Sequence, residues 1–264
     1  MAITGSTMDD RTVPAAAEDG PNVRRGFRRL SWRGEGALFV LALLVYELSR
    51  ALVIGDPSRA FSNAQNLIGW EKAKGIFVET DVQDFFFNYP SVIKALNYFY
   101  IYAHWIVTVA FFVWMYQKRP RWYPYVRNAF FAANGIALIV FMLFPVAPPR
   151  LISGTFVDTL RTISGIDLHG GRLSHFFNPY AAVPSMHFGY ALMIGVVAAL
   201  LLHNWPLRAI ALAYPAVVFF AIVGTANHYI VDSFGGAIAV LLGFAIAATW
   251  FRCARKPSLA AQRR

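Results

Sequence analysis

The chain has 264 residues, of which 57% are hydrophobic, 16% aromatic and only 14% charged. Soluble domains average about 45–50% apolar and about 25% charged residues, so this composition excludes an ordinary soluble domain and indicates an integral membrane protein. The net charge of +10 does not indicate a nucleic-acid binder, because the basic residues cluster beside apolar segments, as at the cytoplasmic face of a membrane protein. The single cysteine, Cys253, excludes a disulfide framework and a cysteine metal site.

The N-terminal residues 1–35 are polar and show no apolar period, which predicts a disordered, basic cytoplasmic tail. The apolar segment that follows starts too late and is too long for a cleavable signal peptide, so we expect it to remain as a membrane anchor. A single membrane catalytic domain is predicted over 36–251. A second basic cytoplasmic tail is predicted over 252–264.

Six segments have the roughly 20 mostly apolar residues that a membrane-spanning helix needs. They are residues 36–54, 93–116, 127–145, 184–203, 207–225 and 228–250. The sequence therefore predicts an all-α integral membrane fold, a six-transmembrane-helix bundle. Most of the 24 Lys and Arg residues fall in the two tails and in alternate loops, which places both termini in the cytoplasm. The loop 146–183 and the turn 225–228 then lie on the outer face.

The first outer loop, about 55–92, contains Phe61, Ala64 and Ile68 at helical spacing, with Glu71 and two lysines nearby. This pattern predicts an interfacial helix that lies on the membrane surface. A soluble loop helix fits the same pattern.

The segment Pro184-Ser185-Met186-His187 opens the fourth predicted span. Because proline is favoured in the first turn of a helix, we expect the helix to begin here, near the outer surface. The free backbone N–H groups of 185–187 and the positive end of the helix dipole would form an anion site. His187 is either a packed structural group or a functional residue, and ionisable residues in membrane segments are functional candidates by default.

A second polar cluster, Asn227-His228-Tyr229-Ile230-Val231-Asp232, opens the sixth predicted span. His228 and Asp232 are four residues apart, so they share a helix face and can form a hydrogen bond. A carboxylate on one imidazole nitrogen fixes the tautomer and makes the other nitrogen a better base or nucleophile. The alternative is a structural His–Asp pair that locks two helices together.

The third predicted span ends in Phe144-Pro145-Val146-Ala147-Pro148-Pro149-Arg150 on the same face. The prolines stiffen this exit and deliver Arg150, whose guanidinium suits bidentate binding of phosphate oxygens. An arginine that only touches lipid headgroups is the alternative. Since His187, His228, Asp232 and Arg150 are all predicted at one face, together they indicate a phosphate site.

The motifs AAVPSMH, HYIVD and PVAPPR, within about 35–250, resemble the type 2 phosphatidic acid phosphatase superfamily. The chain is most similar to the branch that includes the inositol-phosphorylceramide synthases. This resemblance implies six membrane helices and a metal-independent His–His–Asp site without a cofactor.

The resemblance also implies a role for each motif residue. His228 would attack phosphorus and form a phosphohistidine, and Asp232 would orient it and support its charge. His187 would protonate the leaving alcohol and then activate the acceptor. Ser185 and the N–H groups of 185–187 would hold phosphate oxygens. Four residues that flank the motifs are further predicted to bind substrate: Asn178, Tyr180, Asn227 and Tyr229.

The chain departs from the phosphatase-type pattern at its cations. Arg119-Pro120 resembles the Arg-Pro pair of the first motif, but Phe112 stands where that motif has lysine, and the segment is predicted to be cytoplasmic. Ala221-Ile222 stands where the pattern has Ser-Arg before the third-motif histidine. We therefore reject Arg119 and predict that Arg150 replaces these cations. The departures favour a headgroup transferase or a diester-accepting enzyme over a simple monoesterase.

The sequence thus predicts a multi-pass plasma-membrane enzyme, a lipid phosphatase or phospho-headgroup transferase, whose active site faces outside. Its expected partners are membrane lipids and a lipid phosphate substrate, with no nucleic acid and no cofactor. A metal-dependent hydrolase is one alternative, since two histidines and a carboxylate can form a facial metal site. A non-enzymic lipid-binding or transport protein is another. The lipid, the choice between hydrolysis and transfer, and the oligomeric state stay open.

Overall fold

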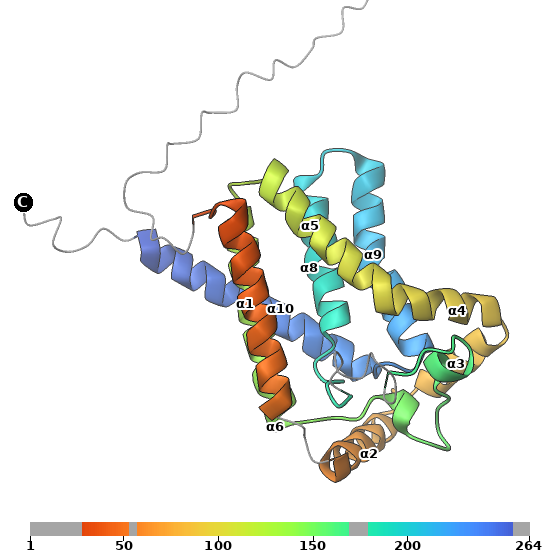
Figure 1. Ribbon diagram of the computed structural model, residues 1–264. Helices are drawn as coiled ribbons and strands as arrows, with labels where there is room; N and C mark the ends of the chain where they lie inside the picture. Colours follow the sequence, from red (N-terminus) through yellow and green to blue (C-terminus); the bar gives the residue numbers. More distant parts are fainter. Residues whose placement is uncertain (1–27, 53–56, 169–178, 256–264) are drawn as a thin grey trace, which may run out of the picture.

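The computed structural model describes residues 28–52, 57–168 and 179–255, and within these ranges the regular structure is helical (Figure 1). The long helices are α1 (Trp32–Leu52), α5 (His104–Lys118), α6 (Tyr123–Leu143), α8 (Met186–Leu201), α9 (Trp205–Gly224) and α10 (Ile230–Arg255). The shorter ones are α2 (Pro57–Ala73), α3 (Glu79–Phe87), α4 (Pro90–Tyr98) and α7 (Thr159–Thr162), with a π-helical turn η2 (Phe99–Ala103) and a 3₁₀ turn η3 (Pro149–Leu151). The predicted all-α architecture is confirmed.

Four helical segments are long and apolar enough to cross a membrane, namely Pro90–Lys118, Tyr123–Leu143, Trp205–Gly224 and Ile230–Cys253. The first of these joins α4, η2 and α5 into one continuous segment. Helix α8 is also apolar but has only 16 residues. Helix α1 has 21 residues, and its side chains are described only up to residue 45. The chain therefore has the helices of a membrane-embedded protein, while the six-span count stays a prediction.

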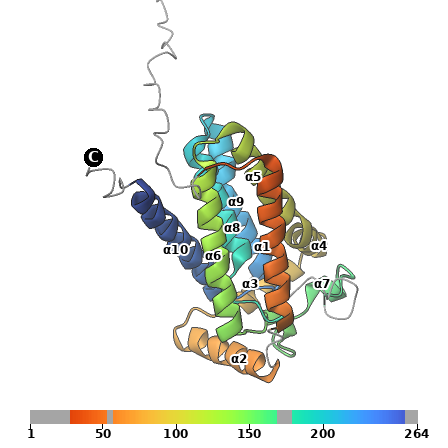
Figure 2. The ribbon, with the colours of Figure 1, turned by 60° about the vertical axis from the view of Figure 1, so that its left-hand side comes forward.

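The long helices pack into a bundle in which α10 crosses the others obliquely (Figures 1 and 2). The most extensive contacts join α10 to α6 and α8 to α9, followed by α10 to α8. Gly243 makes the first of these possible, because a Cβ atom there would clash with the carbonyl oxygen of Ala129. Small residues at such crossings let helix backbones approach closely, as is common in membrane proteins.

Helix α8 begins at Met186, two residues after the start at 184 that the sequence predicts. Ser185 is its N-cap, and the Ser185 Oγ accepts a hydrogen bond from the Phe188 N–H at 3.4 Å. Serine is a favoured N-cap because its side-chain oxygen satisfies one of the free N–H groups of the first turn. Pro184 therefore lies before the N-cap, outside the first helical turn where it was predicted.

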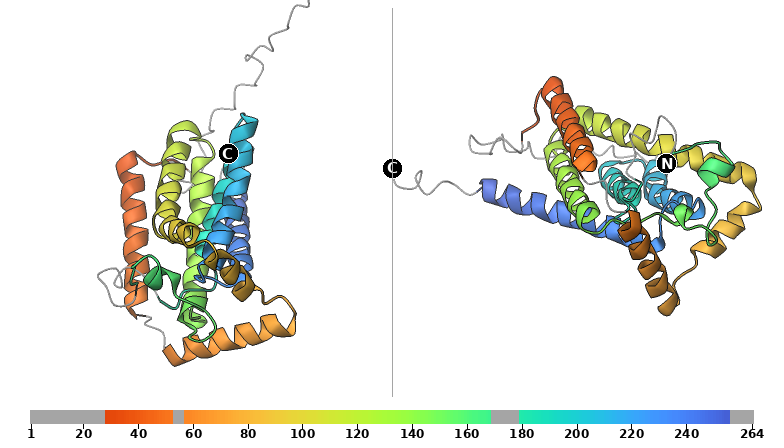
Figure 3. Two further views of the ribbon diagram at one scale, coloured as in Figure 1. Left: turned by 90° about the vertical axis from the view of Figure 1, so that its right-hand side faces the viewer. Right: turned by 60° about the horizontal axis from the view of Figure 1, so that its bottom comes forward.

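Helix α2 lies across one end of the bundle (Figure 3, left). Its buried residues are Ala60, Ala64, Ile68 and Glu71, which share one helix face. This face packs against the segments that carry the predicted motifs, so α2 is an integral part of the fold. Contact of its opposite face with a membrane stays a prediction.

The loop between α6 and η3 is held against both other motifs. The Val146 N–H donates to the Tyr180 carbonyl at 2.9 Å, in a bridge to the segment that precedes α8. The Arg150 N–H donates to the Ala226 carbonyl at 2.7 Å, in the turn that precedes α10. These backbone bonds bring the three predicted motifs together at one end of the bundle.

Candidate active site

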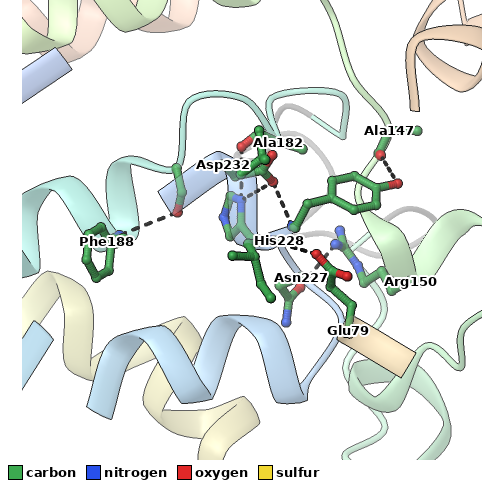
Figure 4. A network of polar contacts seen from close by, with 12 residues as sticks. Glu79, Ala147, Arg150, Ala182, Phe188, Asn227, His228 and Asp232 are labelled. Carbon is green, nitrogen blue, oxygen red and sulfur yellow. Dashed lines mark hydrogen bonds and ion pairs between the residues drawn. The ribbon is translucent and has the colours of Figure 1, made fainter. Parts of the chain in front are cut away.

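The His228–Asp232 pair is formed and buried (Figure 4). His228 Nδ1 lies 3.2 Å from Asp232 Oδ2 and 3.0 Å from the Ala182 carbonyl oxygen. Because both partners are acceptors in the ionised Asp232 state, Nδ1 carries the hydrogen and Nε2 keeps its lone pair. The same Asp232 oxygen accepts the Tyr229 N–H at 2.9 Å, which fixes the carboxylate in the turn. The pair thus has the geometry of an oriented nucleophile or base.

His187 lies beside this pair. Its ring centroid is 5.6 Å from that of His228, so the two imidazoles face one common space. Gly236 permits this approach of α10 to α8, because a Cβ atom there would clash with the Ser185 carbonyl oxygen. The Ser185 N–H also donates to the Asp232 carbonyl at 2.9 Å. The N-cap of α8 and the first turn of α10 are therefore joined directly.

The π-helical turn η2 and the first residue of α5 supply two aromatic neighbours of His187. Tyr100 stacks on the His187 ring with 4.3 Å between centroids, and His104 packs against it at the same distance. His104 in turn stacks on Tyr190, whose hydroxyl donates to Asn134 Oδ1. Single π-helical turns are frequent at functional sites, where they re-aim side chains within a helix. Here the turn places both rings against the candidate acid.

Arg150 reaches the same centre from η3. Its side chain is buried, and Nη1 donates to Asn227 Oδ1 at 3.1 Å (Figure 4). Asn227 is itself held by a 2.7 Å bond from its Nδ2 to Thr225 Oγ1. A guanidinium that is oriented in this way beside two imidazoles provides the positive charge that a phosphate group needs.

These groups line one end of a cavity of about 1250 Å³. At this end the polar wall consists of Tyr100, His104, Arg150, His187, Asn227 and His228, and elsewhere the cavity is also lined by Arg127, Asn128, Asn134 and Tyr190. The first two residues of α8, Met186 and His187, both line it, so the positive end of that helix is directed at the cavity. The rest of the wall is mostly apolar and is provided largely by α1, α6 and α10. The volume exceeds the 300–1,000 Å³ or so of ordinary small-ligand pockets, and the apolar lining suits a long hydrocarbon chain.

A family comparison agrees with this geometry. A family model described as the PAP2 superfamily matches residues 65–246, which is more than half of the chain. The chain belongs to the PAP2 superfamily. No curated protein and no solved structure matches it. Members of this superfamily are in general phosphoesterases, so membership supports a membrane enzyme of the phosphatase type.

The structure brings four of the nine predicted PAP2 site residues to the cavity wall. His187, His228, Arg150 and Asn227 line it, and Asp232 lies behind His228. Ser185 caps α8, Tyr180 packs on Phe61, and the Tyr229 hydroxyl donates to the Ala147 carbonyl at 3.1 Å. None of these three is among the residues that line this cavity, so a direct contact with substrate stays a prediction for them. Asn178 lies outside the described residues.

Arg119 lies at the opposite end of α8. Its Nη2 donates to the carbonyl of Leu201, the last residue of that helix, at 2.8 Å. His187 is near the beginning of α8, and a helix rises about 1.5 Å per residue, so some 20 Å separate the two levels. Arg119 therefore cannot serve the site, as predicted. Ala221 and Ile222, which replace the Ser-Arg pair of the phosphatase pattern, are buried apolar residues.

Two site residues were missed in the sequence. Glu71 of α2 and Glu79 of α3 are completely buried and accept hydrogen bonds from the first residues of α10. The signal for Glu71 was its spacing, because it continues the face of Ala64 and Ile68 by three residues and so belongs to the buried stripe. Nothing in the local sequence indicates that Glu79 turns inward.

A cation site is not evident in the described part of the chain. Residues 28–52, 57–168 and 179–255 contain no group of three or more His, Cys, Asp and Glu side chains that could hold a metal ion. His187 and His228 line the cavity. The Asp232 carboxylate instead contacts Nδ1 of His228, so it is not directed at a metal ion that the two histidines could share.

Proposed function

We propose that this PAP2 superfamily member cleaves or transfers the phosphate group of a membrane lipid through a phosphohistidine on His228. The observation that carries the proposal is the bond from His228 Nδ1 to Asp232, which leaves Nε2 facing a cavity that His187 and Arg150 also line. An oriented imidazole, a second imidazole and a fixed guanidinium match the nucleophile, the acid–base group and the anion clamp of phosphoryl transfer.

In the first step, His228 Nε2 attacks phosphorus and the bond from phosphorus to the lipid alcohol oxygen breaks. His187 donates a proton to that leaving oxygen. Asp232 stabilises the ring as it gains positive charge, while Arg150 and the N-terminus of α8 stabilise the phosphoryl oxygens. Hydrogen bonds already fix the His228 ring and the Arg150 guanidinium, so these side chains would need little rearrangement when substrate binds.

In the second step, an acceptor attacks phosphorus and the phosphorus–nitrogen bond breaks, which returns His228 to its starting form. His187 takes the proton of the acceptor as general base. Water as acceptor gives a phosphatase, and a lipid or headgroup alcohol gives a transferase. The buried apolar pair at Ala221 and Ile222 removes a cation that the phosphatase pattern has, which favours the transferase and its inositol-phosphorylceramide synthase-like branch.

The apolar part of the cavity supports a lipid substrate. Leu38 and Leu41 of α1, Phe130 and Leu138 of α6, and Ile246 of α10 are among the residues along it. A lipid tail in this space would keep the phosphate at the polar end, beside the histidines. The distribution of basic residues supports a plasma-membrane protein with cytoplasmic termini and an outward-facing site.

The test uses purified protein, a panel of lipid phosphates that includes phosphatidic acid and a polyprenyl phosphate, and product analysis with and without an alcohol acceptor. Phosphate release, or a phospho-alcohol product when the acceptor is present, supports the proposal. Activity that persists in a strong chelator separates this mechanism from a metal-dependent hydrolase. Binding of the lipids without any product supports a non-enzymic lipid-binding protein instead.

A further inference from the structure

The two buried glutamates occupy a special position at the beginning of α10. The Glu79 Oε1 accepts the Ile230 N–H at 2.9 Å, and the Glu71 Oε1 accepts the Val231 N–H at 3.4 Å. Together with Asp232, which accepts the Tyr229 N–H, three carboxyl groups cap three successive N–H groups next to His228. Carboxylates are favoured at a helix N-terminus, but three of them in one buried place repel one another if all are ionised.

The remaining oxygen of each glutamate has no partner among the described residues. Glu71 Oε2 and Glu79 Oε2 are both buried, and both side chains are 0% exposed. A buried polar oxygen without a partner costs free energy, and the cost is larger when the oxygen carries charge. A proton on one of the two carboxyl groups relieves both the charge and the missing bond.

We propose that Glu71 and Glu79 act as a carboxyl pair that holds one proton, and that this pair positions His228 by fixing the first turn of α10. Both residues are positioning residues, because they contact the backbone beside His228 and do not line the cavity. The pair also ties the outer-loop helices α2 and α3 to the nucleophile.

The electrostatic surroundings agree with a protonated Glu71. Burial, and next the charge of Glu79, raise the pKa of Glu71 to about 8, with Asp232 as a further cause. The groups that face it are thus Glu79 from α3 and Asp232 from α10, with the Tyr229 phenol close to all three. Lys72 of α2 lies over the Phe77 ring and is exposed. Ionisation of Glu71 would therefore add a third negative charge to those of Glu79 and Asp232, and no cation is among the described groups that act on its pKa.

The sign of the pH dependence follows from the raised pKa. Stability that the protonated Glu71 contributes is complete below its ordinary pKa of 4.5 and is lost as the pH rises through about 8. Above that pH the two carboxyl groups are both ionised and repel each other, so they hold the first turn of α10 less firmly. Turnover should then fall about tenfold per pH unit as the protonated fraction falls.

The test compares wild type with Glu71→Gln, in which the amide keeps an acceptor for the Val231 N–H and a donor for Glu79 at every pH. Asp84→Asn, an exposed acidic residue of α3, is the matched control. We expect the alkaline loss of turnover between pH 8 and 9 to disappear in Glu71→Gln and to persist in Asp84→Asn. A Glu71→Gln profile that superimposes on wild type, or lies below it by one constant factor, overturns the proposal.

The turnover measurement rests on the proposed function, whereas a measurement of the melting temperature does not. The melting temperature in detergent should fall from pH 5 to pH 9 in wild type relative to Glu71→Gln, and a difference that stays constant with pH overturns the proposal. If wild type turns over no lipid phosphate, the proposed function fails while this comparison still decides the role of the pair. If Glu71→Gln does not fold, Glu79→Gln makes the same test from the other carboxyl group.

Discussion

Two buried carboxylates, each bonded to a basic side chain, stand at opposite ends of the bundle, and they differ in what surrounds them. At one end, Glu35 accepts from Arg127 Nη1 at 2.6 Å, from the Tyr123 hydroxyl at 2.9 Å and from the Leu30 N–H at 2.9 Å. At the other end, Asp232 orients His228, whose second ring nitrogen is left for the cavity. The first pair joins α1 to α6 and is saturated with partners. Burial of a carboxylate alone therefore does not indicate a site, whereas a histidine ring that is oriented beside a cavity makes His228 the candidate.

Among the substitutions at the two ends of the bundle, His228→Ala should lower turnover the most. Removal of the nucleophile should lower phosphate release by about 10⁴-fold or more, because no other described group can take its covalent role. The measurement is turnover of the best lipid phosphate by purified protein, with an unchanged melting temperature as the control for folding. Residual activity within tenfold of wild type would remove His228 from the mechanism.

Asp232→Asn tests the orientation of the ring. The amide has nearly the same shape, but it cannot stabilise a positive imidazole and can impose the wrong tautomer on His228. We expect turnover to fall by about 10²–10⁴-fold with little change in KM, as for comparable carboxylate–histidine pairs. A loss of stability with normal turnover per folded molecule would instead make the pair structural, like the one at Glu35.

Arg150→Ala tests the cation at the active end against Arg119→Ala, its matched control at the other end. Loss of the phosphate clamp should lower kcat/KM by about 10²-fold, and Arg150→Lys should recover only part of this because lysine lacks the bidentate fork. Arg119→Ala should stay close to wild type. Equal activities of the two alanine variants would contradict the assignment of Arg150.

Glu35→Ala should act on stability and not on chemistry. Removal of one partner of a buried ion pair typically destabilises a protein by about 3–5 kcal/mol, and here the buried Arg127 would lose its bond to Glu35. Turnover per folded molecule should stay within about twofold of wild type. The measurement is unfolding in detergent beside an activity assay normalised to folded protein, and a selective loss of turnover would contradict the comparison.

Much of the fold could be predicted from the sequence, because apolar segment length is the main determinant of membrane helices. The helical class and the approximate positions of the long helices agree with the structure, with α8 from 186 to 201 where 184–203 was predicted. The π-helical turn η2 was not foreseen, since no local residue pattern separates it from an α-helix. Pro184 was predicted in the first turn of α8, but it precedes the N-cap Ser185, two positions before the first helical residue Met186.

The His228–Asp232 pair could be predicted because both residues lie in one short motif, four residues apart on the same helix face. The proximity of His187 and Arg150 to that pair followed from topology and the predicted membrane face. The parts that were missed depend on tertiary direction: Glu71 and Glu79 turn inward from α2 and α3 to the first residues of α10. Ser185 and Tyr229 were predicted as ligands, yet their described contacts hold the site together.

The most direct test of the central claim is capture of the covalent intermediate. Purified wild-type protein, mixed briefly with a lipid phosphate labelled in its phosphoryl group and then quenched, should carry label that is stable to base and labile to acid. Mass spectrometry should place it on His228, and His228→Ala should carry none. Rapid turnover without any labelled protein, or label on a residue other than His228, would contradict the account.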